Sequence, residues 1–99
     1  DWERLGDVTA KVQEELNEVI TAASPDHTAE EVGDLLFAVV NWARWLKVEP
    51  ESALREANAK FYRRFRAIEQ GAALQGRALD SLTLAEMDAL WNEAKANGL

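Results

Sequence analysis

The sequence predicts an all-α fold, a compact four-helix bundle-like domain. Apolar residues recur at three- and four-residue spacing along most of the chain, which is typical of helices with one buried face. The 99 residues contain no alternating β-branched runs and no Asn-Gly or Asp-Gly hairpin turns. Proline and capping patterns separate four helical segments, and the short connections between them favour antiparallel neighbours.

The first helix is expected to run from Asp1 or Trp2 to Ala23. Its apolar positions form one stripe, made of Leu5, Val8, Val12, Leu16, Val19 and Ile20. The segment Ser24-Pro25-Asp26 should end this helix, because proline cannot continue a helix interior.

The second helix is expected to begin at Thr28, with Glu31 as its capping-box partner, and to end at about Leu46 or Lys47. Apolar residues cover a broad face of this segment: Val32, Leu35, Leu36, Phe37, Val39, Val40, Trp42, Ala43, Trp45 and Leu46. A helix this apolar should be buried on more than one side. In a small protein that suggests a subunit interface, so we expect a homodimer or a higher homo-oligomer formed through helices.

Pro50 fits the first position of a third helix. The core stripe of this helix consists of Leu54, Ala57, Phe61, Phe65 and Ile68. Gly71 and Gly76 are expected to bracket a loop that reaches Asp80. A second capping box at Thr83 then begins a short last helix, which ends at Asn97-Gly98.

Composition indicates a folded globule and excludes several kinds of site. Length and a hydrophobic fraction of 47% fit one domain over residues 1–99, and the start at Asp1 suggests a piece of a longer chain. The absence of cysteine excludes disulfides and zinc thiolate sites, while the single His27 disfavours a catalytic triad or a di-iron site built on Glu-x-x-His pairs. A net charge of −7 opposes binding to nucleic-acid polymers. No apolar run approaches the roughly 20 residues that span a bilayer, so the cytoplasm is the expected location.

Two acidic clusters lie on the first and second expected helices. They are Glu14-Glu15-x-x-Glu18 and Glu30-Glu31-x-x-Asp34, with twelve residues between Glu18 and Glu31. On antiparallel helices this spacing can bring carboxylates from both into one pocket, which is the oxygen-rich environment that Mg²⁺ prefers. Burying several like charges costs free energy unless a cation offsets it. The clusters therefore predict a divalent-cation site.

Each acidic residue also has a simpler interpretation. Glu14 and Glu30 alone would be solvated surface charges. Glu31 could serve only as the capping-box partner of Thr28. Asp34 is harder to explain in this way, because it lies mid-helix, where Asp is a poor helix former.

The third expected helix is basic. Lys60 and Arg64 are four residues apart on one helix face and can neutralise phosphate charge together. The alternative is an exposed stripe that pairs with Glu56 or Glu69. For Trp91 the simpler interpretation is a core position near the end of a helix.

Together these residues resemble the MazG-type all-α nucleoside triphosphate pyrophosphohydrolases. The acidic clusters are similar to the EExxE…ExxD signature of that family. The similarity continues through three further segments: Glu30-Glu31-Val32-Gly33-Asp34-Leu35-Leu36-Phe37, Asn41-Trp42-Ala43-Arg44 and Asn58-Ala59-Lys60-Phe61-x-x-Arg64-Phe65. It covers essentially the whole chain and is greatest to the C-terminal, catalytic half of the two-domain bacterial members.

The resemblance implies hydrolysis of NTPs or dNTPs to the nucleoside monophosphate and pyrophosphate, with Mg²⁺ (alternatively Mn²⁺) required, in nucleotide-pool house-cleaning. By the same resemblance the metal ligands would be Glu15, Glu18, Glu31 and Asp34. The catalytic set would be Glu14, Glu15, Glu18 and Lys60, with Glu14 able to orient or deprotonate the attacking water. The substrate-binding set would be Lys60, Arg64, Asn41 and Trp91, the last against the nucleobase.

Two other functions remain open at this point. One is a related all-α hydrolase with a narrow substrate, such as dUTP, dCTP or phosphoribosyl-ATP. The other is a non-catalytic nucleotide-binding or regulatory module. The sequence does not indicate a base or sugar preference, because one aromatic stack recognises every base.

Overall fold

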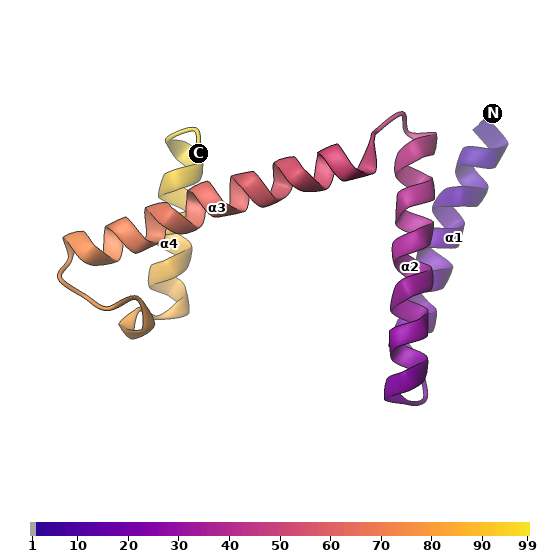
Figure 1. The fold of residues 1–99 in the computed structure, drawn as a ribbon, viewed down its shortest axis with the longest axis horizontal. Helices are drawn as coiled ribbons and strands as arrows, with labels where there is room; N and C mark the ends of the chain where they lie inside the picture. The colour runs from indigo at the N-terminus through magenta and orange to yellow at the C-terminus, as the bar shows by residue number, and fades with distance from the viewer. Residues whose placement is uncertain (1) are drawn as a thin grey trace. The chain divides into compact units, whose positions relative to one another are not determined.

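The computed structural model describes residues 2–99, with side chains from residue 4 onward. It contains four α-helices and one short 3-10 turn, and its described residues form no strand (Figure 1). The elements are α1 (Trp2–Ile20), α2 (Pro25–Trp45), α3 (Pro50–Leu74), η1 (Leu79–Ser81) and α4 (Leu84–Ala96). This confirms the predicted all-α class, while Asp1, one predicted start of the first helix, lies outside the described residues. Dimerisation and the single domain over residues 1–99 stay predictions.

The chain divides into two compact units, residues 1–53 and residues 54–99. The first unit contains α1 and α2, which lie side by side and antiparallel (Figure 1). Ala38 of α2 is buried at 7% exposure, and its small side chain allows the two helices to approach closely. The Trp42 indole Nε1 donates a hydrogen bond of 3.0 Å to the Thr9 hydroxyl, which donates in turn to the Leu5 carbonyl. These hydrogen bonds link α2 to α1.

The boundary between α1 and α2 differs from the prediction. The first helix ends at Ile20 rather than Ala23, and the second begins at Pro25 rather than at Thr28. Ser24 is the N-cap: its backbone is extended and its hydroxyl accepts from the His27 amide at 3.2 Å. Proline suits the first helical position because its missing N–H would have no partner there. The predicted capping box of Thr28 with Glu31 is therefore wrong.

The C-terminus of α2 has an unusual backbone conformation. Lys47 has a φ of 65°, and the Val48 amide donates back to the Ala43 carbonyl at 2.9 Å. This is the hydrogen-bond pattern that glycine commonly completes after a helix. Gly76 after α3 and Gly98 after α4 adopt the same left-handed conformation, with φ values of 66° and 84°. Lysine thus occupies a position that costs an L-residue free energy.

The second unit has the more apolar core. Ile68, Ala72 and Leu82 are buried, and the partly buried residues packed against them are Phe65, Leu79, Met87, Leu90 and Trp91. The predicted loop from Gly71 is wrong, because α3 continues through Gly71 to Leu74. A Cβ on Gly71 would lie 2.7 Å from Leu90 Cδ2, so the glycine admits a side chain of α4 against the helix backbone. Close packing, not a turn, explains this glycine.

The start of α4 confirms the predicted capping box. The Thr83 hydroxyl accepts from the Glu86 amide at 3.1 Å, and the Glu86 carboxylate accepts from the Thr83 amide at 2.9 Å. Arg77 forms an ion pair with the same carboxylate and donates to the Ser81 carbonyl at 2.7 Å. These contacts attach the segment between α3 and α4 to the start of the last helix.

Replacing Ser24 with Ala is expected to lower the free energy of unfolding by about 1 kcal/mol, because it removes the acceptor for the His27 amide. Thr28→Ala is the matched control. Its hydroxyl only donates to the Ser24 carbonyl within the first turn, so its loss should change stability much less. Urea unfolding followed by circular dichroism measures both, and a larger loss in Thr28→Ala would contradict the assignment of the N-cap.

Candidate metal centre

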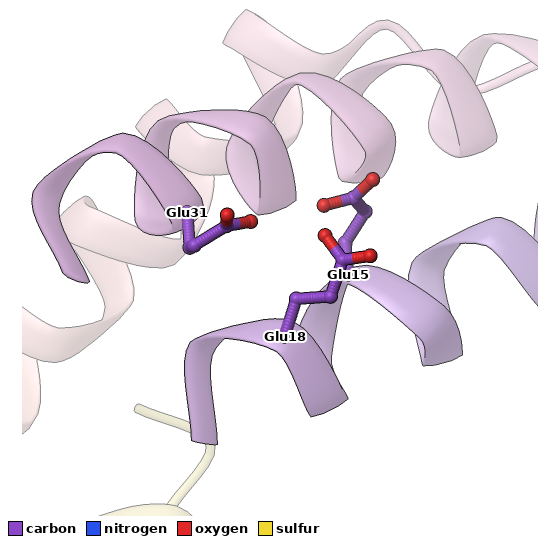
Figure 2. A group of neighbouring side chains, drawn as sticks. All are labelled: Glu15, Glu18 and Glu31. Atoms are coloured by element: carbon purple, nitrogen blue, oxygen red, sulfur yellow. The ribbon is translucent and has the colours of Figure 1, made fainter. Parts of the chain in front are cut away.

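Three carboxylates from two helices converge at the contact between α1 and α2. Glu15 and Glu18 lie three positions apart on α1, and Glu31 lies in the second turn of α2. Each contributes an oxygen to a group whose members lie within 4.8 Å of one another. Figure 2 shows the three side chains directed into the space between the two helices. Of the four carboxylates that are expected to meet, these three lie together in the structure.

The position of Glu31 follows from how α2 begins. Because Ser24 caps the helix, the Glu31 side chain is not used in a capping box. The short connection between Ile20 and Pro25 folds α2 back against α1, which places the first turns of α2 beside the last turns of α1. Glu31 can then face the two glutamates of α1.

Burial of part of this group makes it energetically costly. Glu15 is only 6% exposed, although it carries a charge. Its Oε2 atom and the Oε2 atom of Glu31 are buried without a hydrogen-bond partner. Buried polar oxygens are nearly always satisfied in proteins, and an unpaired buried carboxylate is costly. Two orphaned oxygens that share a cluster are suitable ligands for a hard divalent cation, so these residues fit a metal site.

The neighbouring carboxylates shift the pKa of Glu18. Its pKa is raised above the ordinary value of 4.5. The largest cause is the Glu31 carboxyl, with which Glu18 can share a proton in a hydrogen bond, followed by the negative charge of Glu15. Repulsion between neighbouring carboxylates favours the protonated form of one of them. A bound cation would instead favour the charged form of the carboxylate and lower its pKa.

Lys11, which is not among the predicted site residues, contacts the cluster from one turn earlier on α1. Its Nζ lies 2.9 Å from Glu15 Oε1 and 3.5 Å from Glu14 Oε1. The hydrogen bond to Glu15 is the main reason that the pKa of Lys11 is raised. Its spacing of four residues from Glu15 was a signal for the contact, since such pairs share a helix face.

The other predicted residues of the first unit lie around this group. Asp34 follows Glu31 by three positions, is exposed, and is not among the three carboxylates that converge. Its role as a fourth ligand stays a prediction. Glu14 is exposed and paired with Lys11, and Asn41 is exposed on α2. Their catalytic and substrate-binding roles are likewise untested by the geometry.

The predicted phosphate and base residues belong to the second unit. Lys60 is exposed on α3, whereas Arg64 is half-buried. The Arg64 guanidinium lies over the Trp91 ring, 5.2 Å from its centroid, and Nε donates to the Leu99 carbonyl at 3.0 Å. Phe61 packs against the same ring with a centroid separation of 5.5 Å. Trp91 therefore has a packing role, as its simpler interpretation proposed, and Arg64 stacks on it.

Comparison with known families adds an independent observation. The family model for the MazG nucleotide pyrophosphohydrolase domain matches residues 3–68, which include all three converging glutamates. The chain belongs to this family. The resemblance inferred from the acidic signature is thereby confirmed. The all-helical structure is consistent with the all-α fold of MazG nucleoside triphosphate pyrophosphatases.

Individual MazG relatives match most of the chain. It is 43% identical over 95 residues to the nucleoside triphosphate pyrophosphohydrolase/pyrophosphatase MazG of Thermotoga maritima, a match that covers 96% of this chain and 37% of that protein. It is also 43% identical over 100 residues to a nucleoside triphosphate pyrophosphohydrolase of Escherichia coli K12, with 96% and 38% covered. An uncharacterised Bacillus subtilis protein, YabN, is 55% identical over 65 residues, with 66% and 13% covered. The chain thus spans less than two fifths of the length of these relatives.

The raised pKa of Glu18 predicts how stability of the metal-free protein depends on pH. The folded state binds this proton more tightly than the unfolded state does, so the resulting stabilisation is present below pH 4.5 and is lost as the pH rises through the raised pKa. Glu18→Gln should reduce this loss of stability with rising pH. Glu30→Gln changes an exposed carboxylate on α2 and should not reduce it. Thermal unfolding in chelator across this range measures the effect, and equal slopes in all three proteins would contradict it.

Proposed function

We propose that this chain hydrolyses nucleoside triphosphates, in the ribose or deoxyribose series, to the nucleoside monophosphate and pyrophosphate. The observation that carries the proposal is the group of Glu15, Glu18 and Glu31, with two buried oxygens that lack partners. The names of the relatives from Thermotoga maritima and Escherichia coli support the same reaction. Removing such nucleotides from the cytoplasmic pool would be the corresponding house-cleaning role.

Mg²⁺, or Mn²⁺ in its place, is the proposed cofactor. Glu15, Glu18 and Glu31 would hold it, and Asp34 is proposed as a fourth ligand because it lies one turn after Glu31 on α2. When bound, the ion would neutralise phosphate charge and polarise the phosphate oxygens. Hard oxygen ligands and a high negative charge density favour such an ion over softer metals.

The other side chains supply positioning and proton transfer. Glu14 is exposed next to Glu15, and its carboxylate, which lies 3.5 Å from the Lys11 ammonium, is proposed to orient or deprotonate a water that attacks the phosphoanhydride. Breaking the bond between the α- and β-phosphates releases pyrophosphate as the leaving group. Phosphoryl transfer depends mainly on such positioning and on charge neutralisation.

Substrate contacts are proposed for Lys60, Arg64, Asn41 and Trp91. Lys60 is exposed, so its ammonium is free to approach a polyphosphate. Arg64 already stacks on Trp91, and a guanidinium held in this way keeps its other donors available for phosphate oxygens. A fall in kcat with unchanged KM in Lys60→Ala would argue against a binding role.

A homodimer formed through α2 is part of the proposal. Large apolar side chains of this helix lie in water in a single copy, with Phe37 77% exposed and Leu36 61% exposed. A second copy could cover this surface.

None of the helices among residues 2–99 combines the length and the apolar character needed to cross a membrane.

Product analysis tests the reaction. Incubation with each common NTP and dNTP plus Mg²⁺ is expected to yield monophosphate and pyrophosphate, and orthophosphate as the primary product would contradict the proposed bond cleavage.

Glu31→Gln should lower kcat/KM by on the order of 100-fold or more, because losing even an outer partner of a metal ligand costs about 10–100-fold. Glu30→Gln is the matched control and should stay near the wild-type rate. Activity on one nucleotide alone would favour a narrow-substrate hydrolase, and binding without turnover a regulatory module.

Mass measurement in solution tests the assembly. The wild-type chain is expected to have twice the mass of one copy, and Phe37→Glu should shift it toward one copy because a charge cannot be buried in an apolar contact without cost. Leu74→Glu changes a side chain that is 90% exposed at the end of α3 and should leave the mass unchanged. A wild-type mass of one copy would exclude the dimer.

A further inference from the structure

The two oxygens of the Glu15 carboxylate have different surroundings. Oε1 lies 2.9 Å from the Lys11 ammonium, whereas Oε2 is buried and has no hydrogen-bond partner. The same side chain is one of the three that converge between α1 and α2 (Figure 2). One oxygen is thus held in place and the other is left free for a ligand.

Helix stabilisation does not account for the contact between Lys11 and Glu15. Four residues apart, a lysine that precedes a glutamate is the less favourable order, because the helix dipole prefers the reverse. An exposed pair of this kind would also contribute little to stability. This pair is asymmetric instead, since the lysine side chain is 54% exposed and that of Glu15 only 8% exposed. The ammonium reaches from the solvent side to a buried carboxylate.

We propose that Lys11 is a positioning residue of the metal site, which fixes Glu15 through Oε1 so that Oε2 stays available to the cation. The inference rests on the proposed function, because it concerns the same site. A glutamate side chain has several rotatable bonds, and holding it in one conformation before the ion arrives reduces the entropy lost on binding. Outer partners of metal ligands commonly act in this way. Lys11 also lies 3.5 Å from Glu14, so it links the exposed carboxylate to the buried one.

Mn²⁺ binding to the metal-free chain, without nucleotide, tests the inference. Titration followed by the electron paramagnetic resonance signal of free Mn²⁺ gives the dissociation constant directly. Lys11→Met keeps a similar side-chain length but removes the ammonium, and it is expected to weaken Mn²⁺ binding by about 10–100-fold. Lys11→Arg retains a charged donor and should restore most of the affinity. Lys95→Met, in the last turn of α4, removes the same charge elsewhere and should bind like the wild type.

The outcomes separate the inference from the proposed function. If the wild type binds Mn²⁺ and Lys11→Met binds equally well or more tightly, the inference is overturned, because the ammonium then acts at most as a competing charge. Equal weakening in Lys11→Met and Lys11→Arg, with unchanged circular dichroism, would overturn it as well. Absence of Mn²⁺ binding by the wild type would overturn the metal site itself, and this inference with it.

Discussion

Repulsion among carboxylates is the constraint on which the first unit of this protein depends. Glu15, Glu18 and Glu31 offer oxygens within 4.8 Å of one another, and Glu15 is buried. Such charges interact more strongly as water is excluded, because the effective dielectric constant falls. The chain relieves the repulsion in two ways: Lys11 contacts Glu15, and the pKa of Glu18 is raised so that a proton is bound more readily. Both are features of a group arranged for a positive charge.

The two units differ in the side chains that they bury. Residues 54–99 bury an apolar core around Ile68, Ala72 and Leu82, and Gly71 permits close approach of α4. In the first unit the described core residues are fewer, and the most buried side chains at the α1–α2 contact include a charged one. The helix pair therefore gives up apolar packing where the carboxylates meet. This region lies within the segment that matches the MazG family.

Much of the secondary structure could be predicted from the sequence, because helix periodicity and capping are local. The capping box at Thr83 and the helix start at Pro50 were found correctly. The errors were local choices between two plausible signals. Ser24 and Thr28 can both cap a helix, and in the structure Ser24 is the cap, with an extended backbone and a hydroxyl that accepts from the His27 amide. Gly71 was mistaken for a loop residue because its packing partner, Leu90, lies far along the chain.

The sequence by itself determined the fold class, the family and the two acidic clusters, since these depend on residue type and spacing along single helices. Tertiary structure alone decided which carboxylates meet. Spacing placed Asp34 on the same face as Glu31, but only the contact between α1 and α2 brought Glu31 to Glu15 and Glu18 and left Asp34 exposed. It also decided which oxygens are buried without partners. Burial and the distance between side chains of different helices depend on how two helix surfaces pack. The residue pattern along a single helix does not determine that packing.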